Sequence, residues 1–161
     1  MGVKDNLQRI ADFAREHGLQ VAVAESLTSG ALASCLGAAP EAADWFRGGV
    51  VAYDERVKFE VLGVTPGPLV TERCAGEMAQ GVARLLGADV AVGATGVGGP
   101  EPSEGKPAGT VMVAVRAPGV EDSRAFHFPG RPEAVISATV DEAVSLLVEV
   151  LFSRFSGNPA S

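Results

Sequence analysis

A serine, a tyrosine and a lysine are the side chains of this sequence best placed to do chemistry. Ser26 follows an apolar run at residues 21–24 and precedes a helical pattern, which places it at a strand exit. Tyr53, the only tyrosine, and Lys58 come at and after the end of a second apolar run, at residues 49–53. If the two strands pair, a neutral Lys58 could activate Ser26 as a nucleophile. The alternatives are that Ser26 only caps a helix and that Lys58 is a solvated surface charge.

Backbone amide groups at two turns are the second chemical feature. The turn at residues 25–30 leads into a helix N-terminus, where unpaired N–H groups favour an anion or a developing oxyanion. The loop at residues 95–100 reads Thr-Gly-Val-Gly-Gly-Pro, which allows the backbone to approach a ligand closely. It matches no nucleotide motif, because the segment from Gly99 to Lys106 is too long for a Walker loop and Glu101 replaces a fingerprint glycine. Both segments are therefore ligand-binding loops or plain turns.

Metal and disulfide chemistry are disfavoured by composition. The sequence has 2 histidines, His17 and His127, which lie far apart and lack neighbours that could ligate a metal. Its 2 cysteines, Cys35 and Cys74, are too few for a disulfide scaffold or a thiolate cage. We therefore expect no metal site and no cofactor. With no histidine available, lysine is the natural base for a serine nucleophile.

The elements that must position these groups alternate between strand and helix. Short apolar runs at residues 21–24, 49–53 and 89–95 predict buried strands, and the segments between them have helical periodicity. Two alternating segments around Pro118-Gly119 predict an antiparallel pair, which a long helical pattern follows. The order predicts an α/β fold, a three-layer α/β/α sandwich with a mixed, mostly parallel sheet. In such sheets ligands bind at the carboxyl ends of strands, where the loops named above are expected.

Two helices between the strands have boundaries that can be predicted. A small-residue helical pattern runs over residues 28–36. Thr71 is a good N-cap for a second helix, whose apolar stripe ends before Gly87. The first helix therefore begins two residues after Ser26, and the second ends shortly before the third strand.

Length, charge and hydropathy limit the class of protein. The 161 residues suit one domain, so we expect residues 1–161 to form a single domain. A net charge of −7 argues against nucleic-acid partners, whose phosphates require a basic surface. No apolar run approaches the roughly 18 to 20 residues of a membrane span, and the first residues do not open a signal peptide. The sequence therefore predicts a cytoplasmic protein without membrane partners.

Several motifs together resemble the CinA C-terminal domain family. They run in order over nearly the whole chain, at residues 24–30 (Ala-Glu-Ser-Leu-Thr-Ser-Gly), 45–53 (Trp-Phe-Arg-Gly-Gly-Val-Val-Ala-Tyr), 78–81 (Met-Ala-Gln-Gly), 95–100 and 106–111 (Lys-Pro-Ala-Gly-Thr-Val). The resemblance implies a nicotinamide-nucleotide amidase, which hydrolyses the mononucleotide substrate nicotinamide mononucleotide to nicotinate mononucleotide and ammonia in pyridine nucleotide salvage. It also implies a homodimer. Some relatives carry a separate N-terminal domain, and we expect this chain to be a stand-alone form.

The resemblance further implies roles for particular residues. Ser26 would be the nucleophile, Lys58 its general base, and Tyr53 a partner that orients or relays the proton. The implied substrate-binding residues are Glu25, Thr28, Gly30, Thr95, Gly96, Gly98, Gly99, Lys106 and Arg131. A base must be neutral to accept a proton, and an ordinary lysine has a pKa near 10.4. We therefore expect Lys58 to be partly buried in a cleft and to form no salt bridge with Glu55 or Glu60.

Two positions before the last helix depart from the family pattern. The family has arginines where this sequence has Pro132 and Ile136, and Arg131 lies one residue before the first of them. If those arginines hold the phosphate, activity here is weak, redirected to another substrate, or absent. The alternative function is therefore a nucleotide-binding or regulatory domain of the same fold. The retained serine, tyrosine and lysine favour the enzyme.

Overall fold

The computed structural model describes residues 2–155. The strands are β1 (Val21–Glu25), β2 (Phe46–Val51), β3 (Val90–Gly96), β4 (Thr110–Ala117) and β5 (Val120–His127). The helices are α1 (Val3–His17), α2 (Ala31–Gly37), α3 (Ala42–Trp45), α4 (Glu55–Glu60), α5 (Glu72–Leu86) and α6 (Pro132–Glu149), which continues into the π-helical turn η1 (Val150–Arg154). None of these helices within residues 2–155 is long and apolar enough to cross a membrane.

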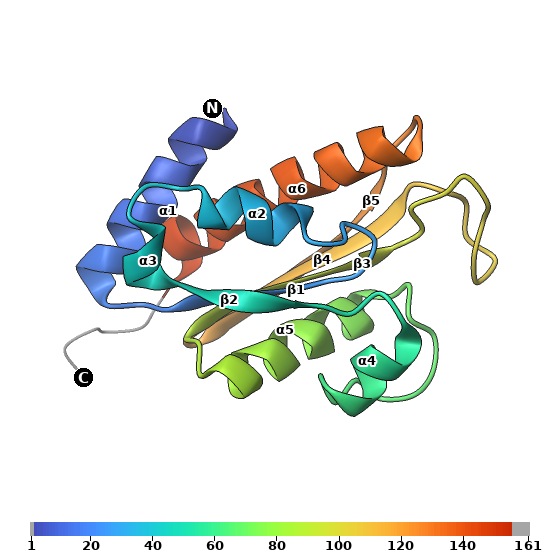
Figure 1. Ribbon diagram of the computed structural model, residues 1–161, viewed down its shortest axis with the longest axis horizontal. Helices are drawn as coiled ribbons and strands as arrows, with labels where there is room; N and C mark the ends of the chain where they lie inside the picture. The colour runs from blue at the N-terminus through green and yellow to red at the C-terminus, as the bar shows by residue number, and fades with distance from the viewer. Residues whose placement is uncertain (1, 156–161) are drawn as a thin grey trace.

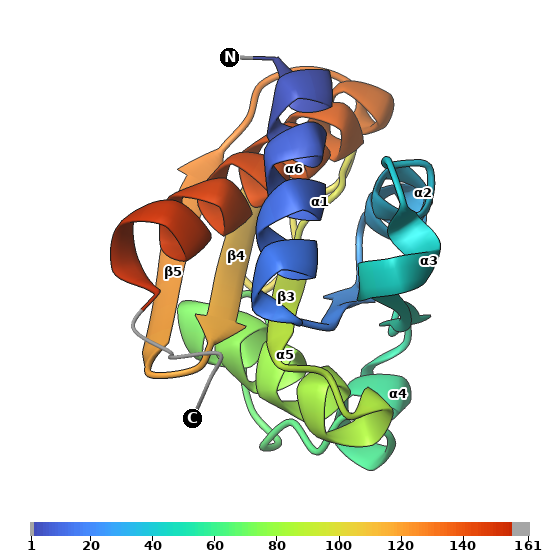
Figure 2. The same ribbon diagram turned by 90° about the vertical axis from the view of Figure 1, so that its left-hand side faces the viewer.

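One five-stranded sheet forms the middle layer, in the order β2-β1-β3-β4-β5. Strand β1 pairs in parallel with both β2 and β3, whereas β4 is antiparallel to β3 and β5. In this sheet β4 therefore runs against the direction of the other strands. Helices α1, α2, α3 and α6 lie on one face and α4 and α5 on the other (Figures 1 and 2). The prediction of a three-layer α/β/α sandwich with a mixed sheet is confirmed.

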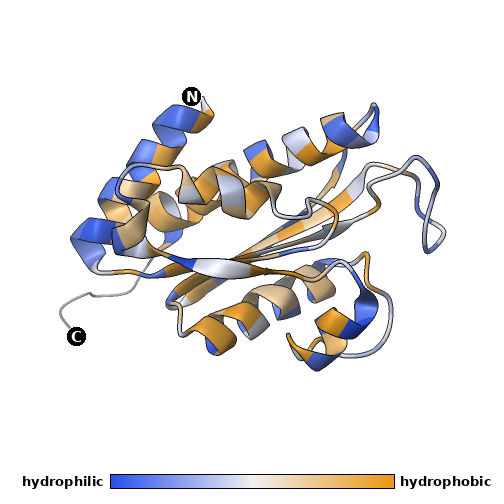
Figure 3. Ribbon diagram, in the orientation of Figure 1, coloured by the Kyte–Doolittle hydropathy of each residue, from blue (hydrophilic) through white to orange (hydrophobic). Residues whose placement is uncertain are grey.

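The two faces of the sheet carry side chains of different size. Because side chains alternate along a strand, every second residue faces the same layer. The residues that pack toward α1 and α6 are mostly valines, among them Val21, Val23, Val90, Val92, Val111, Val113 and Val115. Those that pack on the α5 side are mostly alanines, among them Ala22, Ala24, Ala91 and Ala114. Hydrophobic colouring accordingly runs along the central strands and the helix faces that meet them (Figure 3).

The small-residue face allows α5 to lie directly on the sheet. A Cβ at Gly93 of β3 would overlap the carbonyl oxygen of Ala75, and one at Gly81 of α5 would overlap that of Leu62. The ends of α5 are those predicted, since the Thr71 hydroxyl accepts a hydrogen bond from the Cys74 amide at 3.0 Å. Gly87 ends the helix with a φ of 65°, in the left-handed region that glycine favours.

Helix α2 begins at Ala31, three residues later than the predicted start at residue 28. Ser29 and Gly30 have φ values of 49° and 103°, so the chain makes a left-handed turn before the helix. Periodicity did not reveal this turn, because small residues are compatible with both a turn and a helix. The turn leaves residues 26–30 as a separate loop above the carboxyl end of β1.

Candidate active site

The three predicted strand exits meet at one end of the sheet. They enclose a cavity of about 350 Å³, here called the Ser26 pocket, which is lined by Ser26, Leu27, Ser29, Tyr53, Lys58, Leu69, Val70, Thr95, Gly96, Gly98, Gly99, Ser103, Glu104, Pro132 and Ile136. Its walls come from the segments that follow β1 and β2, from the end of β3, from α4, and from the first turns of α6. The tertiary fold therefore brings together segments that are more than a hundred residues apart in the sequence.

Ser26 is held between the two neighbours of β1. Its amide donates to the carbonyl oxygen of Ala94 on β3 at 3.0 Å, and the preceding Glu25 carbonyl accepts from the Ala52 amide at 2.6 Å. The Ser26 residue is 7% exposed and lines the pocket. Within residues 2–155, the amide groups of Leu27 and Thr28 donate to no protein acceptor. These two N–H groups, next to the serine, are of the kind that stabilises an oxyanion.

Lys58 is buried, as expected. It is 3% exposed, and its Nζ donates to the carbonyl oxygens of Ala52 at 2.8 Å and Tyr53 at 3.4 Å. It lies one turn into α4, where the Asp54 side chain caps the helix by accepting from the Arg56 amide at 2.8 Å. The expected absence of a salt bridge also holds in the described structure, because Glu60 pairs with Arg56 at 3.3 Å and no ion pair joins Glu55 to Lys58.

The environment of Lys58 favours its neutral form. Burial lowers the pKa of Lys58 below the ordinary lysine value, because the charged ammonium loses its hydration. The neighbouring groups that oppose this shift are Cys74, Asp54, Glu55 and Glu104. Burial raises the pKa of the Cys74 thiol to about 11, so the thiol is neutral near pH 7. Burial therefore moves the pKa of Lys58 in the direction that a general base requires.

No hydrogen bond joins Ser26 Oγ to Lys58 Nζ within the described residues, although both side chains line the same pocket. Catalytic hydrogen bonds are often long without substrate and tighten in the reacting complex. Tyr53 is 71% exposed at the pocket mouth. Its backbone carbonyl contacts Lys58, but across residues 2–155 its phenol makes no hydrogen bond. The relay role of Tyr53 therefore stays a prediction.

Glu25 and Thr28 do not line the Ser26 pocket. Glu25 is fully buried, and its carboxylate accepts hydrogen bonds from Thr28 Oγ1 at 2.5 Å and from the amides of Leu32 and Ala33, each at 2.9 Å. The carboxylate thus accepts from amides at the N-terminus of α2 and is not part of the pocket lining. Gly30 is also absent from the pocket lining, and its positive φ serves the turn instead. Together these residues fix the loop that presents Ser26.

The predicted glycine loop does line the pocket. Thr95 is buried and donates from Oγ1 to the Leu69 carbonyl at 3.1 Å, and Gly96, Gly98 and Gly99 follow along the same wall. A Cβ at Gly96 would lie 2.5 Å from the Thr110 carbonyl oxygen, so this strand end requires glycine.

Glu104 is a pocket residue that sequence reasoning missed. Its carboxylate accepts hydrogen bonds from the amides of Leu69 at 2.9 Å and Val70 at 3.0 Å. The 98–106 loop is thereby fastened to the segment before α5, and a carboxylate lies in the pocket wall. The only signal in the sequence was that Pro-Ser-Glu at residues 102–104 replaces glycines of the family loop. Nothing in that pattern indicated which backbone amides the carboxylate would bind.

Lys106 and Arg131 are two further predicted residues that the structure places outside the pocket lining. Arg131 is exposed and pairs with Glu133 at 2.9 Å, two residues along the chain. Pro132 and Ile136 line the pocket instead, from one side of the first turns of α6. The two positions identified as departures from the family pattern are therefore part of the pocket wall. Lys58 and Glu104 are the charged side chains in this lining.

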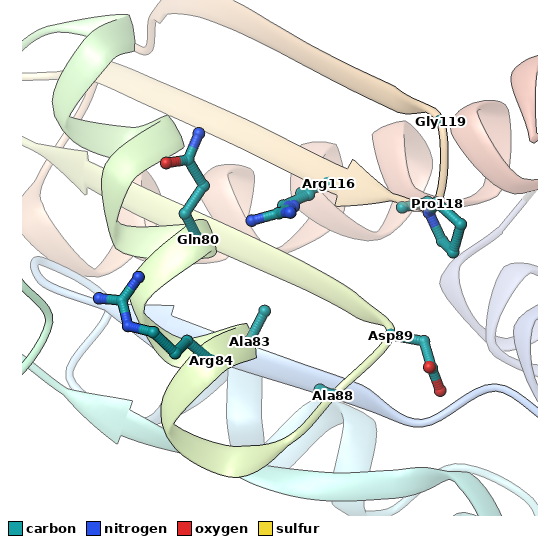
Figure 4. A pocket seen from close by; sticks show the side chains of 9 residues that line it. Gln80, Ala83, Arg84, Ala88, Asp89, Arg116, Pro118 and Gly119 are labelled. Atoms are coloured by element: carbon teal, nitrogen blue, oxygen red, sulfur yellow. The ribbon is translucent and has the colours of Figure 1, made fainter.

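A second hollow, of about 440 Å³, lies at the other end of the sheet. This Arg116 hollow is lined by Gln80, Ala83, Arg84, Ala88, Asp89, Arg116, Ala117, Pro118 and Gly119. Figure 4 shows the side chains of α5 on one side of it and Arg116, near the end of β4, on the other. Its charged residues are exposed, and it contains no group that the sequence analysis selected.

The described residues thus form a three-layer α/β/α protein with a serine and a buried lysine in one pocket at the ends of its strands. The family model described as CinA C-terminal domain matches residues 4–151, so the chain belongs to that family. Protein YdeJ of Escherichia coli K12 is 37% identical over 139 residues, which cover 83% of this chain and 81% of YdeJ. A CinA-like protein of Frankia casuarinae is 36% identical over 156 residues, 93% of this chain.

Solved structures agree with the family assignment. The crystal structure of a competence-damaged protein (CinA) superfamily protein from Klebsiella pneumoniae 700603 has a TM-score of 0.88 and 34% identity, over 94% of this chain and 98% of that one. The chain spans about a third of the length of several curated relatives, 36% in the Frankia protein. Those longer relatives therefore share a fold with this chain, but their functions as whole proteins do not transfer to it.

Proposed function

We propose that this chain is an amidase that hydrolyses a primary carboxamide of the nicotinamide class, with nicotinamide mononucleotide as the substrate that the family resemblance implies. The observation that carries the proposal is Lys58, a buried lysine with a lowered pKa that shares one pocket with Ser26. A lysine prepared in this way is a general base for a hydroxyl nucleophile. We further propose that this chain acts as a single amidase domain, in the cytoplasm and as a homodimer.

The proposed acylation step begins with neutral Lys58 and protonated Ser26. Lys58 Nζ takes the Ser26 hydroxyl proton as Oγ forms a bond to the amide carbon, and the C=O electron pair moves to oxygen. The amides of Leu27 and Thr28 stabilise the resulting oxyanion. When the carbonyl re-forms, the C–N bond breaks and protonated Lys58 gives its proton to the leaving amine. Ammonia departs and an ester to Ser26 remains.

Deacylation repeats these transfers with water. Neutral Lys58 removes a proton from water as the oxygen attacks the ester carbon, and collapse of the second tetrahedral intermediate breaks the C–Oγ bond. Lys58 returns its proton to Ser26 Oγ, which restores both groups and releases the carboxylic acid. One water is consumed and one ammonia is released per turnover, so no oxidant or second substrate is needed.

Ammonia release from nicotinamide mononucleotide tests this proposal. We expect the wild-type protein to release ammonia in proportion to its concentration, and Ser26→Ala to lower kcat by at least about 10⁴-fold, the range of single nucleophile losses. Ser34→Ala, an exposed serine on α2, is the matched control and keeps wild-type activity. Equal rates for wild type and Ser26→Ala would remove Ser26 from the mechanism.

A ligand-binding domain without catalysis is the second candidate. It is favoured by the lack of a Ser26–Lys58 hydrogen bond within residues 2–155. In that case the wild type and Ser26→Ala would both bind carboxamide ligands by titration calorimetry, and neither would release ammonia. Binding without turnover in both proteins would therefore leave only this second function.

A further inference from the structure

The charges that line the Ser26 pocket do not suit a phosphate. Lys58 is the pocket's cation, and its Nζ is already directed to two backbone carbonyls while its environment favours the neutral form. Glu104 contributes a carboxylate held in place by two backbone amides. Pro132 and Ile136 give the α6 wall an apolar surface. A dianion entering this pocket would meet the Glu104 carboxylate, apolar side chains, serine hydroxyls and the amides of Leu27 and Thr28, but within residues 2–155 no guanidinium lines the pocket.

The N-terminus of α6 does not replace the missing cations. Helix N-termini commonly bind phosphate through free amides, but Pro132 at the start of α6 has no N–H. The amides of Ala134 and Val135 donate to the Arg131 carbonyl at 2.9 and 3.1 Å. Glu133 adds a carboxylate to the same first turn. Two of the first amides of α6 are therefore already occupied, and the first residue supplies none.

Building on the proposed amidase activity, we propose that this chain prefers, over the mononucleotide, a carboxamide without a phosphate that is attached to an uncharged or cationic group. A pyridinium nucleoside such as nicotinamide riboside has this chemistry. Its cationic ring suits a wall that carries the Glu104 carboxylate, and its ribose suits an apolar surface with serine hydroxyls nearby. The pocket volume of about 350 Å³ is at the small end of ligand sites, which favours the smaller molecule.

The chemistry of the base supports the same substrate class. A phosphate dianion in the pocket would stabilise the ammonium form of Lys58, whereas a pyridinium cation stabilises the neutral form. The net charge of −7 also disfavours the approach of an anion over the whole surface. A substrate without phosphate therefore leaves the proposed base in the form that catalysis needs.

Paired substrates test this inference, because nicotinamide riboside and nicotinamide mononucleotide differ only in the phosphate. We expect kcat/KM for ammonia release to be at least about tenfold higher for the riboside. In parallel, calorimetry with Ser26→Ala should give a Kd for the riboside at least about tenfold lower than for the mononucleotide. Equal values, or a preference for the mononucleotide, overturn the inference and leave the amidase proposal standing. Binding of the riboside without ammonia release in the wild type refutes the amidase alone, and binding of neither ligand overturns the inference.

A charge added at Ile136 tests the cause of the preference. Ile136→Arg brings a guanidinium to the α6 wall and should move the kcat/KM ratio, or the Kd ratio, toward the mononucleotide by about tenfold. Ile136→Gln is the matched control with a polar but uncharged side chain, and its ratio should stay near that of the wild type. An unchanged ratio in Ile136→Arg, with the variant folded, would show that the α6 wall does not decide substrate charge.

Discussion

The Ser26 pocket and the Arg116 hollow lie at opposite ends of the same sheet and differ in how they treat charge. In the Ser26 pocket the lysine is 3% exposed and contacts two carbonyls, so its ammonium form is destabilised. In the Arg116 hollow the charged groups are exposed: Arg84 donates to the Leu62 carbonyl at 3.4 Å, and Asp89 accepts from the Gln20 amide at 2.8 Å. The Arg116 hollow has more charged side chains, but water screens them. It is therefore less able than the Ser26 pocket to change the chemistry of its charged groups.

The two ends also differ in how their loops are held. The loop that presents Ser26 is fixed by the buried Glu25 carboxylate, and the opposite wall by Glu104, each through two backbone amides. The turn at Pro118-Gly119, beside the Arg116 hollow, only joins two antiparallel strands. Rigid support combined with desolvation is what a catalytic pair requires, and it occurs at one end of this sheet.

Among the changes that compare the two hollows, loss of the proposed base should produce the largest effect. Lys58→Met removes the amine but keeps the apolar stem, and we expect kcat/KM for carboxamide hydrolysis to fall by about 10³-fold. Arg116→Met makes the equivalent change in the other hollow and should leave kcat/KM within about twofold. Steady-state ammonia release measures both variants. A similar loss in both would mean that the two hollows do not differ in function.

Loss of the buried carboxylate should have a smaller effect, on stability. Glu25→Gln replaces one acceptor oxygen with an amide donor facing Leu32 or Ala33, so we expect the free energy of unfolding to fall by about 1–3 kcal/mol. Asp89→Asn is the matched change at the other end, where the side chain is exposed, and should cost less than about 0.5 kcal/mol. Urea unfolding midpoints compare the two. Equal shifts would contradict the assignment of Glu25 as the support of the Ser26 loop.

The smallest effect concerns the pH dependence of the base. In the proposed mechanism activity requires neutral Lys58, so kcat should rise with pH until Lys58 is deprotonated, with a midpoint below the ordinary lysine pKa. Glu104 is one of the groups that raise the pKa of Lys58. Glu104→Gln should therefore move the acidic limb of the kcat profile to lower pH, by up to about one unit. Glu121→Gln, beside the Arg116 hollow, should leave the profile unchanged; a shift to higher pH in Glu104→Gln would contradict this sign.

Much of the fold was predictable because its signals are local. The apolar runs at residues 21–24 and 89–95 became β1 and β3, whereas the run at residues 49–53 overlaps only the last three residues of β2. Thr71 and Gly87 flank α5 as predicted. Helix α3 was not predicted, since four residues give too little periodicity to identify a helix. The predicted start of α2 was wrong because Ser29 has a left-handed φ. That conformation belongs to a turn that the Glu25 carboxylate holds in place.

The candidate site divides in the same way. The sequence by itself determined which groups could react: a serine at a strand exit, a lysine after the next strand, and a glycine loop, with histidine too scarce to serve as the base. Only the tertiary structure decided that Lys58 and Glu25 are buried. It also decided that Glu104, Pro132 and Ile136 line the pocket. The physical reason is that reactivity and substrate charge depend on desolvation and on neighbouring groups, which come from segments far apart in the chain.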